Sequence, residues 1–230
     1  MIEFFICLLI TVTIHEAAHM LVALRCGIGV KAFSIGFGKP YLHKTIKGID
    51  YRLSPLPFGG YVDIKGMESK GNKDDFLTHP YRHKFAVIIA GVTVNILLAL
   101  IVYLFHYGSI KLGLAIDWII LKSMFTKDYT MVEYIFRNIP INFFLLQLSI
   151  LNLFCGITNL LPIPALDGGH LWLVLMEKVW KEKFIKRYTI ITYVGFAFLI
   201  ITQLWLIGWL YYHEIIQWIN SILLWLSNLL

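Results

Sequence analysis

The sequence is poor in charged residues and in cysteine. Charged side chains make up 15% of its 230 residues, well below the roughly 25% of an average soluble domain. The three cysteines follow no C-x-x-C spacing, which argues against a disulfide framework and against a thiolate zinc site. We interpret them as small apolar packing residues. No internal repeat or low-complexity tract is evident.

Hydrophobic residues dominate instead. They form 58% of the chain, and the mean hydropathy of +0.72 predicts an α-helical membrane protein that crosses the bilayer several times. Spanning a bilayer takes about 20 apolar residues, and the predicted spans are 2–24, 85–107, 139–176 (longer and interrupted) and 188–212. The last apolar run, 215–230, carries several polar residues and is predicted to be a C-terminal interfacial or re-entrant helix.

The basic residues predict the orientation of the chain. Eleven lysines and arginines lie in 25–84 and five in 178–187, whereas only four lie in 108–138. Because cytoplasmic loops carry the excess of positive charge, we expect the N-terminus outside the cell membrane. The net charge of +6 is then explained by a basic cytoplasmic face, and no nucleic-acid partner is expected.

The first cytoplasmic loop, 25–84, is predicted to hold a small sheet or hairpin. The short segments 31–37, 41–46 and 51–56 are rich in β-branched and aromatic residues and are separated by glycine-containing breaks. Two prolines and a glycine pair exclude a helix over 55–62. Such an apolar segment must bury its backbone in protein or line a cavity. The polar stretch 65–75 is predicted to be a solvated loop, and 112–125 an interfacial helix beyond the second span.

The chemistry is concentrated in His15-Glu16-Ala17-Ala18-His19, inside the first predicted span. H-E-x-x-H places two imidazoles on one helix face for zinc, with a glutamate that can take a proton from water. Helical rise places His15 roughly 10 Å inside the cytoplasmic boundary of the bilayer. Ionisable groups at that depth are costly and usually functional. A structural zinc site or a buried ion network is the alternative.

A third ligand is predicted where proline interrupts the third span. The segment 159–170 contains Pro162 and Pro164, which end a helix, followed by Asp167 and two glycines that free the backbone. Asp167 precedes the next cytoplasmic charges by about ten residues, or ~15 Å if helical, a depth similar to that of the histidines. His170 is a competing ligand, although a hydrogen-bonding role is commoner for it.

These motifs, in this order, resemble the site-2 protease family of intramembrane zinc metalloproteases, of the bacterial type without PDZ domains. The resemblance covers 1–187 as a protease core. Four motifs carry it: H-E-A-A-H, P-F-G-G-Y-V, A-G-V-T-V-N and N-L-L-P-I-P-A-L-D-G-G-H. The remainder, 188–230, is expected to hold the fourth span and the last helix. The resemblance implies that His15, His19 and Asp167 bind one zinc ion and that Glu16 is the general base.

The resemblance also implies the residues that contact the substrate. Asn95 and Asn159 would hold the substrate or intermediate, and the family's β-loop, here Gly59, Gly60 and Tyr61, would pair with an extended substrate. Asn95 could instead bond between helices, and the two glycines could simply form a turn. Two departures are visible: Val92 stands where the family often has proline, and 108–138 is too short for a PDZ domain.

The expected function is therefore an intramembrane zinc endopeptidase that cleaves single-span membrane proteins near the cytoplasmic side of the bilayer. Regulated proteolysis and clearance of signal-peptide remnants are both open, as is the oligomeric state. There are three alternatives: a membrane zinc protease of another type with Glu177 as third ligand, a catalytically silent scaffold or chaperone, and a transporter. The intact Glu16 favours an enzyme over a scaffold, and the lack of an inverted repeat disfavours a transporter.

Overall fold

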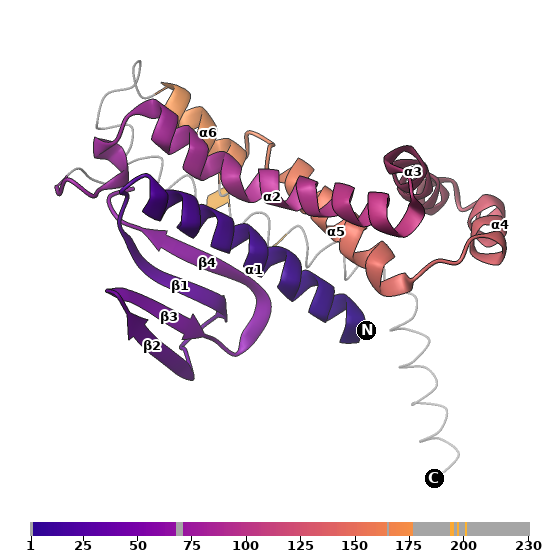
Figure 1. Cartoon of the computed structure of the whole chain (residues 1–230), viewed down its shortest axis with the longest axis horizontal. Helices are drawn as coiled ribbons and strands as arrows, with labels where there is room; N and C mark the ends of the chain where they lie inside the picture. The colour runs from indigo at the N-terminus through magenta and orange to yellow at the C-terminus, as the bar shows by residue number, and fades with distance from the viewer. Residues whose placement is uncertain are drawn as a thin grey trace, which may run out of the picture.

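The computed structural model describes residues 2–67, 71–164 and 166–176, together with positions 194, 195, 197 and 201. The predicted last helix and Glu177 lie outside the described residues, as does nearly all of the predicted fourth span. Within the described part, the chain is mostly helical with one small sheet (Figure 1).

Two helices are long and apolar enough to cross a membrane: α1 (Ile2–Arg25) and α2 (Tyr81–Tyr107). They confirm the helices predicted over 2–24 and 85–107. α2 begins one turn earlier than predicted, directly after Pro80, and ends at Gly108 in the left-handed conformation, which glycine adopts without strain.

The third apolar run is broken, as predicted. α5 (Phe143–Thr158) and α6 (Asp167–Met176) are separated by a link that contains both prolines. Gly168 corrects one detail, because it lies inside α6 and is not in the left-handed region. A Cβ there would lie 2.2 Å from the Leu161 carbonyl oxygen. The glycine is therefore needed for a close approach of backbones, and not for an unusual φ angle.

The loop between α1 and α2 forms a four-stranded mixed sheet in the order β2-β3-β1-β4. The strands are β1 (Val30–Phe37), β2 (Leu42–Ile46), β3 (Ile49–Leu53) and β4 (Leu56–Ile64). β1 pairs in parallel with β3 and antiparallel with β4. The strand predicted over 51–56 is wrong at its end, because β3 stops at Leu53. The Ser54 N–H still donates to the Ile35 carbonyl beside the Leu53–Ile35 pair, but Pro55 has no N–H to continue the ladder.

One face of this sheet packs on the C-terminal half of α1. Phe33, Ile49 and Ile64 are buried with Met20 and Ala23 of α1 in one hydrophobic cluster. Apolar burial contributes about 25 cal/mol per Å², so the sheet is anchored to the part of α1 that carries the H-E-x-x-H motif. β4 contacts α1 most extensively of the four strands.

The predicted solvated loop 65–75 is partly a buried turn. The Asp75 side chain is 6% exposed, and its carboxylate accepts hydrogen bonds from the backbone N–H groups of Gly71 and Asn72 at 2.8 and 2.6 Å. A buried carboxylate needs such donors. Residues 71–75 are thereby fixed against the short helix η1 (Phe76–Thr78) that precedes α2.

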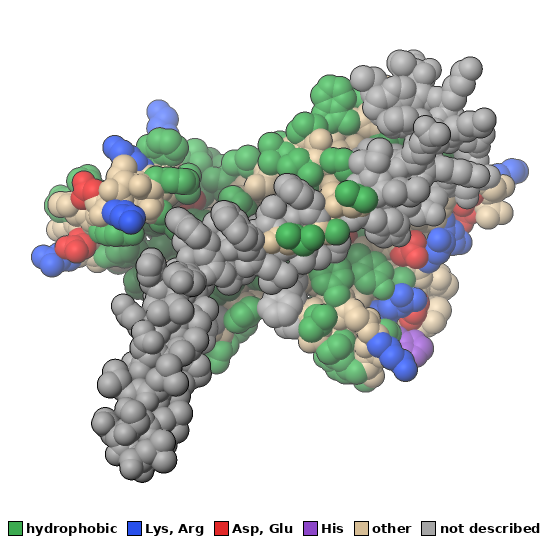
Figure 2. Space-filling model, turned by 180° about the vertical axis from the view of Figure 1, so that it is seen from behind, with side chains coloured by type: hydrophobic (Ala, Val, Ile, Leu, Met, Phe, Trp, Pro, Cys, Tyr) green, Lys and Arg blue, Asp and Glu red, His purple; other side chains and the backbone are tan. Residues whose placement is uncertain are grey.

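At the opposite end of the molecule lie α3 (Ile110–Thr126), which confirms the helix predicted over 112–125, and α4 (Thr130–Asn138), which was not predicted. In Figure 1, α3 is seen nearly end-on while α2 runs across the picture, so α3 lies across the long helices. Figure 2 shows the molecule from behind. On this face, charged side chains lie at both ends, and the described side chains between them are mainly hydrophobic. This arrangement is typical of a membrane protein.

Candidate metal centre

Helix α1 places His15 and His19 one turn apart on the side that faces α2. The two imidazoles are 5% and 6% exposed, and their ring centroids are 4.7 Å apart. Positions i and i+4 share one face of a helix, so this proximity follows from the spacing alone. Their burial follows from packing against α2, α5 and β4.

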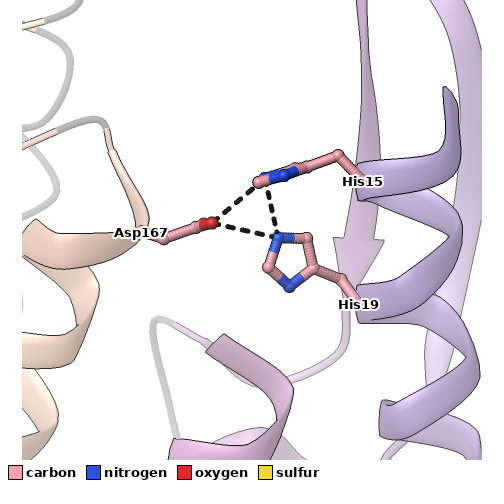
Figure 3. A group of neighbouring side chains, drawn as sticks. All are labelled: His15, His19 and Asp167. Atoms are coloured by element: carbon pink, nitrogen blue, oxygen red, sulfur yellow. Dashed lines mark hydrogen bonds and ion pairs between the residues drawn. The ribbon is translucent and has the colours of Figure 1, made fainter. Parts of the chain in front are cut away.

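Asp167, the first residue of α6, brings a carboxylate to both histidines (Figure 3). Its Oδ2 lies 3.0 Å from His15 Nε2 and 3.2 Å from His19 Nε2, and the two Nε2 atoms are 3.1 Å apart. Among the described residues, these three form the group of histidine and carboxylate side chains that could hold a metal ion. The depth argument from the sequence predicted this convergence.

The three atoms fit a zinc ion. Asp167 Oδ2 is buried and has no hydrogen-bond partner of acceptable geometry, although two ring nitrogens lie beside it. Converging lone pairs are stabilised by a cation placed between them. In a tetrahedral site with bonds of about 2.0–2.1 Å, two ligand atoms are about 3.3 Å apart, close to the observed separations. Three protein ligands leave the fourth position open, as in catalytic zinc sites.

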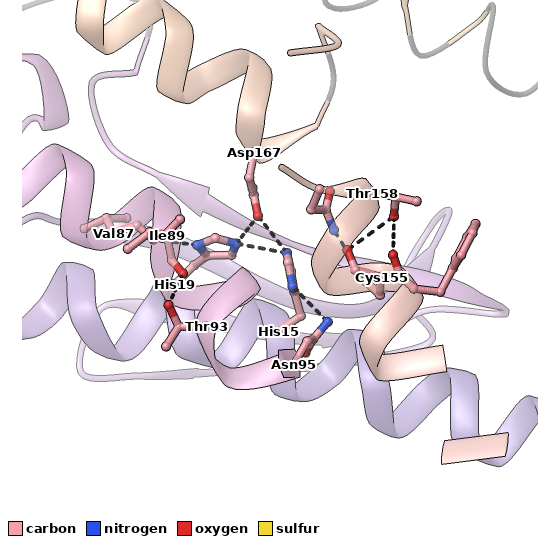
Figure 4. Close-up of polar contacts among 11 residues, drawn as sticks. His15, His19, Val87, Ile89, Thr93, Asn95, Cys155, Thr158 and Asp167 are labelled. Carbon is pink, nitrogen blue, oxygen red and sulfur yellow. Dashed lines mark hydrogen bonds and ion pairs between the residues drawn. The ribbon is translucent and has the colours of Figure 1, made fainter. Parts of the chain in front are cut away.

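One face of α2 supports the two imidazoles (Figure 4). His19 Nδ1 lies 2.7 Å from the Val87 carbonyl oxygen, and His15 Nδ1 lies 3.2 Å from the Asn95 side-chain amide. Between them, a Cβ on Gly91 would lie 2.4 Å from His19 Nε2 and 2.6 Å from His15 Cε1. Only glycine at position 91 leaves room for both rings. Sequence reasoning identified Gly91 as part of a motif but missed this role.

Glu16 shares a cavity with the metal cluster. The cavity has a volume of about 120 Å³, and its lining includes Glu16, His19, Asp167, His170 and Val62 of β4. A carboxylate and two candidate ligands thus face one partly open cavity, which suits a base acting on a water held there. His170 lines this cavity but does not belong to the candidate ligand group.

β4 brings the predicted substrate-binding loop beside Glu16. It is the last strand in the sheet order, so within the described residues one of its edges is free of strand pairing. A Cβ on Gly60 would lie 2.6 Å from the Ser34 carbonyl oxygen and 3.7 Å from Glu16 Cγ. Gly59 likewise leaves room for the Phe37 ring, at 2.4 Å. Because both glycines lie inside a strand, the turn considered as the alternative is wrong.

Tyr61 and Asn159, the other predicted substrate residues, do not line this cavity. Tyr61 stacks on Phe37 and its hydroxyl accepts a hydrogen bond from Arg52 at 2.9 Å. Asn159 ends α5, and its backbone carbonyl accepts the Gly168 N–H at 2.6 Å. Asn159 therefore connects the end of α5 to the start of α6, where Asp167 lies. The substrate contacts of these residues stay predictions.

Comparison with known proteins identifies the family. The model of peptidase family M50 matches residues 3–202. The chain belongs to peptidase family M50. A candidate zinc metalloprotease of Chlamydia pneumoniae is 41% identical over 112 residues, which are 43% of this chain and 18% of that protein. The corresponding protein of Campylobacter jejuni is 38% identical over 96 residues, 39% of this chain and 26% of that protein.

The regulator of sigma-E protease RseP of Escherichia coli is 35% identical over 107 residues, covering 44% of this chain and 24% of RseP. The matches to these three curated relatives therefore span about a quarter or less of the relatives' own lengths. Family and relatives confirm the predicted class, a zinc metalloprotease of the site-2 protease type with zinc as its cofactor. Together with the two apolar helices, they indicate a membrane protein.

Proposed function

We propose that this chain is a zinc endopeptidase that cleaves single-span membrane proteins within the bilayer. The observation that carries the proposal is the convergence of His15, His19 and Asp167 at a cavity also lined by Glu16. A structural zinc site would be satisfied by four closed ligands and would need no neighbouring base. Three candidate ligands with a carboxylate beside them favour hydrolysis.

When bound, zinc would polarise the scissile carbonyl and activate a water molecule. The chain's own contribution is Glu16, which accepts the proton of that water and then delivers it to the leaving amine. His15 directly precedes Glu16 and His19 follows it by three residues in α1. The rigid helix therefore fixes the backbone positions of the base and of both histidines relative to one another.

The substrate segment binds in extended form along the free edge of β4. A helical peptide hides its carbonyls in internal hydrogen bonds, whereas an added strand presents them and gains main-chain hydrogen bonds from the sheet. Gly60 has no side chain to separate the incoming backbone from Glu16. The arrangement supports cleavage at a carbonyl that lies between the β4 edge and Asp167.

The topology that accompanies this function has four spans, with 1–187 as the protease core and 188–230 as the fourth span and an interfacial helix. The N-terminus lies outside the cell, and the catalytic site faces the cytoplasm. Support comes from the sheet, which lies between α1 and α2 in the chain, within the segment 25–84 whose sequence contains eleven basic residues.

The test is cleavage in proteoliposomes that contain the purified chain and a panel of single-span peptides, with products identified by mass spectrometry. The wild type should cut within or beside the apolar segment. Glu16→Gln should keep its zinc and lose about 10²–10⁴-fold in rate, the usual contribution of a general base. A Glu16→Gln chain that cuts at the wild-type rate would exclude Glu16 as the base, and a wild type with no cleavage of any peptide would favour a scaffold.

A further inference from the structure

Asn95 faces a candidate zinc ligand and not the cavity. Its side chain is completely buried in α2, its Nδ2 lies 3.2 Å from His15 Nδ1, and it is not among the residues that line the cavity. Its Oδ1 is buried and has no hydrogen-bond partner among the described residues. An unpaired buried acceptor costs about 1–3 kcal/mol, so a donor is needed beside it.

Two side chains beside Asn95 carry a donor: the Cys155 thiol, which shares a hydrogen bond with the Asn95 side chain, and His15. Of the two, only His15 must place a proton toward Asn95 in order to bind a metal ion. A neutral imidazole carries one proton, on either Nδ1 or Nε2. His15 Nε2 faces Asp167 and His19, so it can bind a metal ion only when the proton is on Nδ1. An Nδ1–H group requires an acceptor, and the only Asn95 atom that can accept is Oδ1.

A half-turn of the Asn95 amide about its Cβ–Cγ bond exchanges Oδ1 with Nδ2. The two amide orientations fill nearly the same volume, and the hydrogen-bond network decides between them. In the exchanged orientation, Oδ1 accepts the His15 Nδ1–H. One rotation therefore gives the unpaired oxygen a partner and leaves the lone pair of His15 Nε2 directed at the metal cluster.

His19 shows the same arrangement one turn further along. Its Nδ1 lies 2.7 Å from the Val87 carbonyl oxygen, which can only accept, so its proton is on Nδ1 and its Nε2 is free for a metal. Val87, Gly91 and Asn95 are spaced four residues apart and share one face of α2. This face provides an acceptor for each histidine and a glycine between them.

We propose that Asn95 is a positioning residue whose side-chain oxygen accepts the His15 Nδ1–H and so holds His15 in its metal-binding tautomer. The proposal rests on the proposed function, because it assumes that His15 is a zinc ligand. It assigns Asn95 to the support of the metal centre, and not to the substrate contact that family resemblance implied. Such partners orient a ligand and raise its basicity.

The experiment compares zinc affinity in three forms of the full chain, purified in detergent, by competition with a chelator of known affinity. Asn95→Leu keeps the branched shape and the number of side-chain heavy atoms and removes the acceptor. It should weaken zinc binding about 10–100-fold, as loss of an outer-shell partner does in other zinc sites. Asn95→Asp keeps an acceptor oxygen and should recover most of that affinity. The absorption bands of the Co²⁺-loaded protein should shift in Asn95→Leu and not in Asn95→Asp.

Asn152 offers a matched control. It is also completely buried, and its Nδ2 donates a hydrogen bond to the Thr11 hydroxyl of α1 at 2.9 Å, one turn before His15. Asn152→Leu removes a buried hydrogen bond between helices without touching the metal cluster. It should lower the melting temperature and leave zinc affinity at the wild-type value.

Two results would overturn the assignment of Asn95 alone: zinc affinity in Asn95→Leu equal to that of the wild type, or an equal loss in Asn95→Leu and Asn152→Leu with no recovery in Asn95→Asp. A wild type that binds zinc no more tightly than His15→Ala would overturn the proposed metal site as well. The His15→Ala measurement therefore distinguishes a failure of the inference from a failure of the proposed function.

Discussion

Two aspartates are partly buried in different parts of the described structure, one at the start of α6 and one in α3, and their surroundings differ. Asp167 meets two imidazole nitrogens that can direct lone pairs toward it. Asp117 of α3 accepts a hydrogen bond from the Tyr103 hydroxyl of α2, and burial raises its pKa to about 6. One carboxylate faces acceptors and the other faces a donor. A buried acid in a membrane protein therefore indicates a metal site only when other lone pairs converge on it.

The largest effect expected from this comparison is on zinc binding. Asp167→Ala removes a proposed direct ligand, so zinc affinity should fall by more than the roughly 10–100-fold that loss of an outer-shell partner causes. Asp117→Ala should leave zinc affinity unchanged. Chelator competition on both purified variants measures the difference. Equal zinc affinity in Asp167→Ala and wild type would remove Asp167 from the ligand set.

The next prediction uses two glycines that make the same kind of close contact, one beside the candidate ligands and one in α3. A Cβ on Gly91 would lie 2.4 Å from His19 Nε2, and a Cβ on Gly113 would lie 2.3 Å from the Tyr103 ring. Each Gly→Ala change should therefore destabilise the chain by about 1–3 kcal/mol through overpacking.

Only Gly91→Ala should also weaken zinc binding, because its clash is with the candidate ligands themselves. Thermal unfolding and zinc titration of the two variants separate the effects. If Gly113→Ala lowered zinc affinity as much as Gly91→Ala, the contact between α2 and α3 would not be independent of the candidate metal cluster.

The smallest effect is on pH dependence. The pKa of Asp117 is raised from its ordinary value of 3.8 to about 6 in the folded chain, so the unfolded chain ionises first as pH rises. Wild-type stability should therefore decline between about pH 4 and pH 6. Asp117→Asn cannot ionise and should show a shallower decline, as measured by melting temperatures in detergent over that range. If stability fell with pH equally in the wild type and in Asp117→Asn, the pKa of Asp117 would be the same in the folded and the unfolded chain, which would contradict the prediction.

The sequence was sufficient to predict which side chains converge on the candidate metal site. H-E-x-x-H fixes its own geometry through the helical period, and Pro162 and Pro164 mark the break that presents Asp167. Their similar depth from opposite ends of the spans predicted that they meet. The convergence that the structure contains, at 3.0 and 3.2 Å, confirms that argument.

Features that depend on register between distant elements were not predictable. Which α2 residues face the imidazoles is decided by the packing of α1 on α2. The alternative that Asn95 bonds between helices agrees with its contact to His15, but the sequence did not identify His15 as the partner or show the need for glycine at position 91. The parallel pairing of β1 with β3 was missed as well, because consecutive short strands favour hairpins. Only the assembled sheet shows that β4 is its edge.

The most direct test of the central claim is X-ray absorption at the zinc edge on the purified wild-type chain. We predict one zinc per chain, bound by two histidine nitrogens and by oxygen ligands at about 2.0–2.2 Å, and loss of that signal in His15→Ala and in Asp167→Ala. A shell containing sulfur at about 2.3 Å, or an unchanged spectrum in both variants, would contradict it.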